Sequence, residues 1–216
     1  AHSDTNFPGL PSPFRPARMA GDSAPELSMD FTFLESLQED WKPVSKPAAI
    51  GWCIFYGLFI FHALRAHGGF LLIDHVNLVI HEGGHLLFGW LGQTLGLWGG
   101  TLLELIVPFA LAVYFTFSRH TTGAAFSSFF FFENLLYIGT YMADARSQGL
   151  PLVTVGDPEE GGHDWFNIFS SLGLLPYDRT IGGMTRLAGW LGMLATVGWL
   201  IYRWRCSAGA GKTSET

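Results

Sequence analysis

The chain has 216 residues, of which 49% are hydrophobic and 14% charged, and its mean hydropathy is +0.27. Soluble domains carry about a quarter charged residues, so this composition excludes an ordinary water-exposed surface and favours a lipid bilayer as solvent. The formal net charge of −6 comes without a basic patch, which excludes nucleic-acid binding. The only cysteines, Cys53 and Cys206, form neither a disulfide framework nor a metal knuckle.

Residues 1–46 are rich in Pro, Ser and Asp, and they predict a mobile polar tail. The tail contains one short periodic apolar patch: Phe31, Leu34, Leu37 and Trp41. This patch predicts a short interfacial helix. Equally, it could cover a soluble face, because its acidic neighbours would be repelled by anionic lipids.

Five apolar runs follow, and each is close to the ~20 residues that a helix needs to cross the hydrocarbon layer. They lie near residues 47–65, 70–92, 100–118, 123–144 and 182–203. Ordinary helix stops separate them, namely Gly68-Gly69, Gly99-Gly100, Arg119-His120 and a polar loop with a short amphipathic helix over 146–180. The sequence predicts an all-α, multi-pass integral membrane bundle of about five spanning helices over residues 47–205, followed by a disordered tail over 206–216.

The second apolar run contains His81-Glu82-Gly83-Gly84-His85. Two imidazoles four residues apart project from one face of a helix, close enough to share a metal ion, and Glu82 sits beside a metal-bound water. Such residues are expensive in a spanning helix, by roughly 2–4 kcal/mol for a charged group. The motif predicts a zinc site with His81 and His85 as ligands and Glu82 as catalytic base. A polar cluster without metal is the alternative.

Gly83 and Gly84 each weaken a helix by roughly 1 kcal/mol relative to Ala. Their place beside the histidines predicts that another segment approaches this backbone closely. The segment could be a substrate strand, or it could be a neighbouring helix packed through small residues.

The motif resembles the site-2 protease family of intramembrane zinc metalloproteases, whose members carry His-Glu-x-Gly-His on a spanning helix. His81, Glu82, Gly84 and His85 match this pattern. The family takes its third ligand, an aspartate, from a later Leu-Asp-Gly type motif, often after a Leu-Pro segment. The stretch that looks like this element runs from Leu150-Pro151 through Asp157-Pro158 to Gly161-Gly162-His163-Asp164-Trp165. The resemblance covers about residues 71–172 and implies cleavage of a membrane-spanning protein in or near the bilayer.

Several acidic or imidazole side chains could supply the third ligand: Glu104, Glu133, Asp144, Asp157, His163 and Asp164. The pair His163-Asp164 lies in the one long loop, which can dip toward the site if it lines a water-filled cavity. Otherwise the pair only caps the helix that follows. Glu133 lies at about the depth of His81, because the second and fourth spans run in the same direction.

Glu133, Asn134 and Glu104 could equally support the site instead of binding the metal. They could hold a ligand imidazole by its other ring nitrogen, or bind the substrate backbone.

We also consider two non-proteolytic functions. The polar residues could line a metal-transport path or bind a partner subunit, but they concentrate around one depth, which favours a fixed site over a path. Alternatively, His81 and His85 could bind a haem or another cofactor of a larger complex. Two histidines four residues apart on one helix cannot bind opposite faces of one haem iron, so we rank this function last.

Overall fold

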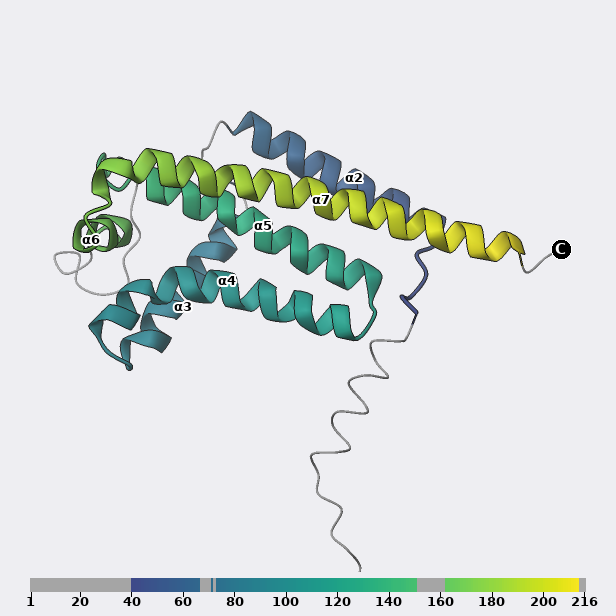
Figure 1. Cartoon of the computed structure of the whole chain (residues 1–216), viewed down its shortest axis with the longest axis horizontal. Helices are drawn as coiled ribbons and strands as arrows, with labels where there is room; N and C mark the ends of the chain where they lie inside the picture. Colours follow the sequence, from purple (N-terminus) through teal and green to yellow (C-terminus); the bar gives the residue numbers. More distant parts are fainter. Residues whose placement is uncertain (1–39, 67–70, 72, 151–161, 214–216) are drawn as a thin grey trace, which may run out of the picture. The chain divides into compact units, whose positions relative to one another are not determined.

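The computed structural model describes residues 40–66, 71, 73–150 and 162–213, and every regular element among them is a helix (Figure 1). The elements are α2 (Lys46–Arg65), α3 (Asp74–Gly89), α4 (Gln93–Phe117), α5 (Thr121–Ala143), α6 (Asp164–Ser171), a 3₁₀ turn η1 (Leu175–Tyr177) and α7 (Asp178–Thr213). The prediction of an all-α bundle is confirmed.

The bundle is built from successive helix pairs. In Figure 1, α5 runs along α7, α4 along α5 and α3 against α4, and α2 also contacts α7. One apolar core joins α2, α5 and α7 through residues such as Tyr56, Phe129 and Met193. A second core joins the end of α5 to α6 through Ile138 and Trp165. This second core fixes α6, and therefore Asp164, beside α3 and α5.

Within the described residues, three helices are long and apolar enough to cross a membrane: Lys46–Arg65, Gln93–Phe117 and Leu175–Ala208. They indicate a membrane protein, but the expected count of five spans is not confirmed. At 16 residues, α3 is about 24 Å long, which is shorter than a hydrocarbon core of about 30 Å. The remaining helix, α5, is long enough but contains Glu133 and Asn134.

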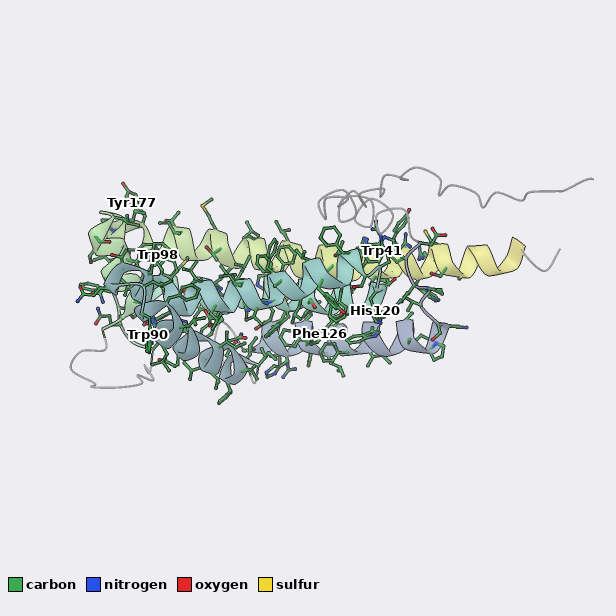
Figure 2. All side chains as sticks on the ribbon, turned by 90° about the horizontal axis from the view of Figure 1, so that it is seen from below. Trp41, Trp90, Trp98, His120, Phe126 and Tyr177 are labelled. Atoms are coloured by element: carbon green, nitrogen blue, oxygen red, sulfur yellow. The ribbon has the colours of Figure 1, made fainter. Side chains whose placement is uncertain are left out.

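Amphipathic aromatic side chains lie at both ends of the helices. Figure 2 labels Trp90, Trp98 and Tyr177 near one end and Trp41 near the other. Trp41 contacts Trp199 with ring centroids 4.9 Å apart, and the guanidinium carbons of Arg119 and Arg203 lie 5.4 and 5.5 Å from its ring centroid. Trp and Tyr are enriched at membrane interfaces, so this distribution fits a protein whose helices cross a bilayer.

The turn between α3 and α4 does not lie where the sequence predicts it. We expected a helix break at Gly99-Gly100, but the helix is continuous there and the turn lies at Gly92, whose φ is 115°. Gly99 serves packing instead, because a Cβ built on it would lie only 2.5 Å from the carbonyl oxygen of Gly84. The segment that approaches the backbone of Gly84 is therefore the neighbouring helix α4.

The C-terminal end of the chain differs from expectation. The last helix continues to Thr213, whereas a disordered tail was expected from residue 206. This part of the prediction is wrong, because a helix that has already formed can extend by one hydrogen bond per added residue. The predicted N-terminal tail, apart from its last residues 40–46, lies outside the described residues.

Candidate metal centre

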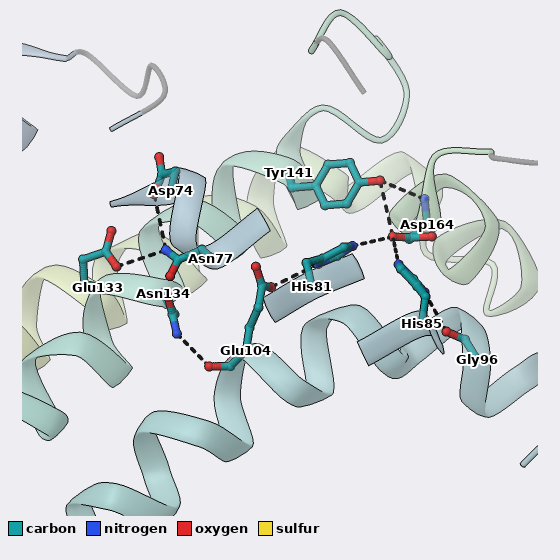
Figure 3. Close-up of polar contacts among 10 residues, drawn as sticks. All are labelled: Asp74, Asn77, His81, His85, Gly96, Glu104, Glu133, Asn134, Tyr141 and Asp164. Atoms are coloured by element: carbon teal, nitrogen blue, oxygen red, sulfur yellow. Dashed lines mark hydrogen bonds and ion pairs between the residues drawn. The ribbon is translucent and has the colours of Figure 1, made fainter. Parts of the chain in front are cut away.

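The candidate centre joins side chains from two separate helices (Figure 3). His81 and His85 lie one turn apart on α3, with ring centroids 4.7 Å apart. Asp164 is the first residue of α6, and its Oδ2 atom lies 2.9 Å from Nε2 of His81 and 3.1 Å from Nε2 of His85. One nitrogen or oxygen atom of each residue lies within 4.8 Å of the other two. A single metal ion could therefore be bound by all three.

The other ring nitrogen of each histidine is held by α4. Nδ1 of His81 lies 3.3 Å from Oε2 of Glu104, and Nδ1 of His85 lies 2.7 Å from the carbonyl oxygen of Gly96. When Nδ1 donates its proton to such an acceptor, Nε2 keeps the lone pair that a metal needs. Glu104 is fully buried, so this contact is shielded from water. Glu104 was predicted as a supporting residue, and the contact that it makes is with His81.

A glycine on α4 makes room for the His81 ring. A Cβ built on Gly100 would lie 2.5 Å from Nε2 of His81, which is closer than real atoms approach. Any larger residue at this position would push the ring away from Asp164. Gly100 is therefore part of the site even though it has no side chain.

Asp164 is held in place by Tyr141 on α5. The backbone N–H of Asp164 donates to the Tyr141 hydroxyl at 3.1 Å, and that hydroxyl lies 3.4 Å from Oδ2 of Asp164. Burial opposes ionisation of this carboxyl, but its hydrogen bonds with His81 and His85 outweigh burial and lower the pKa of Asp164 to about 2. The side chain is therefore a carboxylate at neutral pH, which is the form that binds metals.

His163 was an alternative third ligand, and the structure gives it a different role. Its Nδ1 accepts the backbone N–H of Phe166 at 3.2 Å and so caps α6, while Nε2 lies 3.5 Å from Oδ2 of Asp144. Its ring packs on Tyr141, with centroids 4.2 Å apart. Burial lowers the pKa of His163 despite the nearby Asp144, which favours the neutral imidazole. The residue that meets both histidines is therefore Asp164, and His163 is not among the three side chains that come together there.

Glu82, the predicted base, follows His81 directly on α3. Successive helical residues project about 100° apart, so Glu82 lies beside the face that carries the two histidines. It is half-buried, and the His85 side chain is 26% exposed, whereas that of His81 is 5% exposed. The centre is therefore closed at His81 and more open toward His85 and Glu82.

Glu133 and Asn134 do not reach the histidines directly. Nδ2 of Asn134 donates to the backbone carbonyl of Glu104 at 2.6 Å, which ties α5 to the residue that holds His81. Glu133 accepts a hydrogen bond from Asn77 at 3.2 Å. Asn77 precedes His81 by four residues, which is about 6 Å along the helix. Glu133 therefore lies about one helical turn away from the depth of His81, where it was expected. Glu133 is therefore not the third ligand.

Five residues of the site were missed from the sequence: Asp74, Asn77, Gly96, Gly100 and Tyr141. The first two follow a helical pattern with His81 and His85, because positions 74, 77, 81 and 85 share one face of α3. That spacing could have revealed them, and it also corrects the expectation that polar residues gather at one depth. Gly96 contributes its backbone carbonyl, and Tyr141 contributes its contact with Asp164 at the start of α6. The sequence gives no signal for either contribution. Asp157, another candidate ligand, lies outside the described residues.

Comparison with known proteins adds nothing to this description, because no protein-family model, curated protein sequence or solved structure matches the chain. The fold and the site define an all-helical membrane protein with a candidate metal centre of two histidines and one aspartate.

Proposed function

We propose that this chain is a multi-pass, membrane-embedded zinc metalloprotease-like hydrolase that cleaves a peptide bond in or near the bilayer. The observation that carries the proposal is the meeting of Asp164 with His85, 79 residues earlier in the chain, at the open end of a His-Glu-x-x-His motif. A third ligand at this place is what a catalytic zinc site requires, since such sites use three protein ligands and leave a fourth position for water or substrate.

The spacing of the three side chains suits zinc. Zinc binds imidazole nitrogen and carboxylate oxygen at roughly 2.0–2.2 Å, so neighbouring ligand atoms in a tetrahedral site lie about 3.4 Å apart. The observed separations of 2.9 and 3.1 Å from Oδ2 of Asp164 need to widen by only a few tenths of an ångström. The carboxylates of Asp164 and Glu104 would also balance the two positive charges of the ion.

Glu82 is the residue that we assign as general base. When bound, zinc lowers the pKa of its water toward ~7 and polarises a substrate carbonyl. Glu82 accepts a proton from the attacking water and passes it to the amine that leaves when the C–N bond breaks. Its half-buried position beside the histidines, on the more open side of the site, suits this task.

The identity of the third side chain is in line with the resemblance to the site-2 protease family. In that family the third ligand is an aspartate in a Leu-Asp-Gly type motif, often just after a Leu-Pro segment, and here Asp164 comes 13 residues after Pro151. The substrate class implied by the resemblance is a membrane-spanning protein. Three helices long enough to cross a bilayer fit a protein that meets its substrate there.

A second candidate function is metal transport or another non-proteolytic role in a membrane complex. One observation favours it: Asp74, Asn77, His81 and His85 place polar groups along about 16 Å of a single face of α3. Polar groups at successive depths are typical of ion paths. A transporter would move zinc into sealed liposomes without any need for Glu82 as base.

The test uses the purified full-length chain with its bound metal. Wild-type protein is expected to contain one zinc per chain and to cleave peptides from a library of membrane-spanning segments reconstituted with it. Glu82→Gln should keep the zinc and lose cleavage, whereas Asp164→Ala should lose both. Cleavage by Glu82→Gln at the wild-type rate would refute the assigned base, and zinc flux into liposomes without cleavage would favour the second candidate.

A further inference from the structure

A second group of buried polar side chains lies between α3 and α5, next to the histidine centre (Figure 3). Asp74, Asn77 and Glu133 are 3%, 0% and 1% exposed. Nδ2 of Asn77 lies 3.4 Å from Oδ1 of Asp74 and 3.2 Å from Oε2 of Glu133. The two carboxyl groups also interact directly with each other.

Two carboxylates at this depth need a positive partner. Removing an unpaired charge from water is far more costly than removing a polar neutral group, so buried charges are paired or bind metals. Other titratable groups that act on the pair include His75 on the same helix, Glu104 on α4 and Tyr137 on α5. Glu104 lies beside His81 and cannot supply a positive charge. As a carboxylate it is negative, so it adds to the need for a cation.

Unpartnered oxygen atoms at the same place point to a bound cation. Asn77 and Asn134 are both fully buried, yet Oδ1 of each has no hydrogen-bond partner among the described residues. Buried side-chain oxygens are rarely left without a partner in native proteins. In Figure 3 the Asn77 side chain lies between Asp74, Glu133 and Asn134, with its nitrogen toward the two carboxyl groups and its oxygen toward Asn134.

The dimensions of the group distinguish between ions. The nitrogen and oxygen of an Asn side chain exchange places by a half turn, which puts Oδ1 of Asn77 where Nδ2 lies. Oδ1 of Asn77 would then lie 3.4 Å from Oδ1 of Asp74 and 3.2 Å from Oε2 of Glu133, which makes a group of three oxygens. Oxygen ligands of Ca²⁺ at 2.3–2.6 Å lie roughly 3.3–3.7 Å apart, whereas those of Mg²⁺ at 2.0–2.1 Å lie about 2.9 Å apart.

We propose that Asp74, Asn77 and Glu133 form a second cation site, made only of oxygen donors and sized for Ca²⁺. Asp74 is already oriented for this task, because its Oδ2 accepts the backbone N–H of Leu71 at 2.6 Å and leaves Oδ1 toward Asn77. The proposal does not depend on zinc at the histidine centre, because the two sites share no ligand and differ in donor chemistry.

The test is calcium binding to the purified full-length chain in detergent, first stripped of metal and then loaded with one equivalent of zinc. Wild-type protein is expected to bind one further Ca²⁺ per chain, more tightly than Mg²⁺. Glu133→Gln and Asp74→Asn should each weaken calcium binding by about tenfold or more and leave the zinc content unchanged. Glu82→Gln, the same kind of change on α3 outside this group, should bind calcium as wild type does. His85→Ala should lose zinc and keep calcium.

An infrared measurement on wild-type protein keeps the proposal testable even if these variants fail to fold. A carboxylic-acid carbonyl band that disappears when Ca²⁺ is added would support a site that exchanges a proton for the ion. A band that persists at saturating calcium would mean that the pair holds a proton instead. That result, or no saturable calcium binding by the wild type, would overturn the proposal.

Discussion

Nδ1 of His81 lies 3.3 Å from Oε2 of Glu104, so a carboxylate on α4 fixes the ring whose other nitrogen faces Asp164. This contact crosses the tight interface between α3 and α4. The ring of His81, a candidate ligand on α3, is therefore oriented by the neighbouring helix α4 as well as by α3.

Removing the Glu104 carboxylate should therefore weaken the metal site. Loss of a group that holds a ligand imidazole typically lowers metal affinity 10–100-fold, and we expect this loss for Glu104→Ala. Glu104→Gln, which keeps an acceptor oxygen, should lose less. The measurement is zinc competition with a chromophoric chelator. Equal affinities for wild type and Glu104→Ala would show that the contact does not orient His81.

The glycines of this interface allow a matched pair of variants. Gly100→Ala places a methyl group against Nε2 of His81, so we expect lower zinc affinity and a loss of stability of about 1–3 kcal/mol. Gly83→Ala is the control, because its new methyl would meet nothing nearer than Cδ2 of Leu103 at 3.8 Å. It should be neutral or gain up to about 1 kcal/mol from helix propensity. Zinc titration and thermal unfolding check both, and a normal site in Gly100→Ala would contradict the packing argument.

The helical bundle and the two histidines of the candidate centre could be predicted from the sequence because both depend on local patterns. Apolar runs of helix length and a four-residue histidine spacing need no knowledge of tertiary contacts. The choice between His163 and Asp164 did need it. Their loop is fixed by contacts of Trp165 with Trp98, whose ring centroids are 5.6 Å apart, and of Asp164 with Tyr141.

The error at Gly99-Gly100 has a different origin. Glycine both stops helices and permits close packing of helices, and the two uses look alike in a single sequence. Only the partner, Gly84 on the preceding helix, distinguishes them. The expected count of five spans is not confirmed for a related reason. Glu133 and Asn134, which lie inside the bundle, lower the mean hydropathy of α5.

The identity of the third ligand can be tested by cobalt substitution. Because His163 caps α6 and does not face the centre, His163→Asn, which can still cap a helix, should leave the visible ligand-field spectrum of bound Co²⁺ unchanged. Asp164→Asn should alter or abolish that spectrum. A spectral change in His163→Asn comparable to that of Asp164→Asn would mean that the imidazole is a ligand after all.

Acid should destabilise the metal-free protein through Asp164. The pKa of its carboxyl is lowered from 3.8 to about 2, so its contribution is present above about pH 4 and is lost as the pH falls toward 2. A shift of this size corresponds to about 2 kcal/mol. The difference in unfolding free energy between wild type and Asp164→Asn should therefore shrink over this range. A difference that is constant with pH would show that the ionised carboxylate does not stabilise the fold.

The central claim, that two imidazoles and one carboxylate bind a single zinc ion, is tested most directly by the zinc X-ray absorption spectrum of the purified full-length chain. We predict one zinc per chain with two imidazole ligands and oxygen ligands at roughly 2.0–2.2 Å, and a spectrum that changes in Asp164→Asn. Protein without stoichiometric zinc, or a zinc spectrum identical in wild type and His81→Ala, would contradict the account.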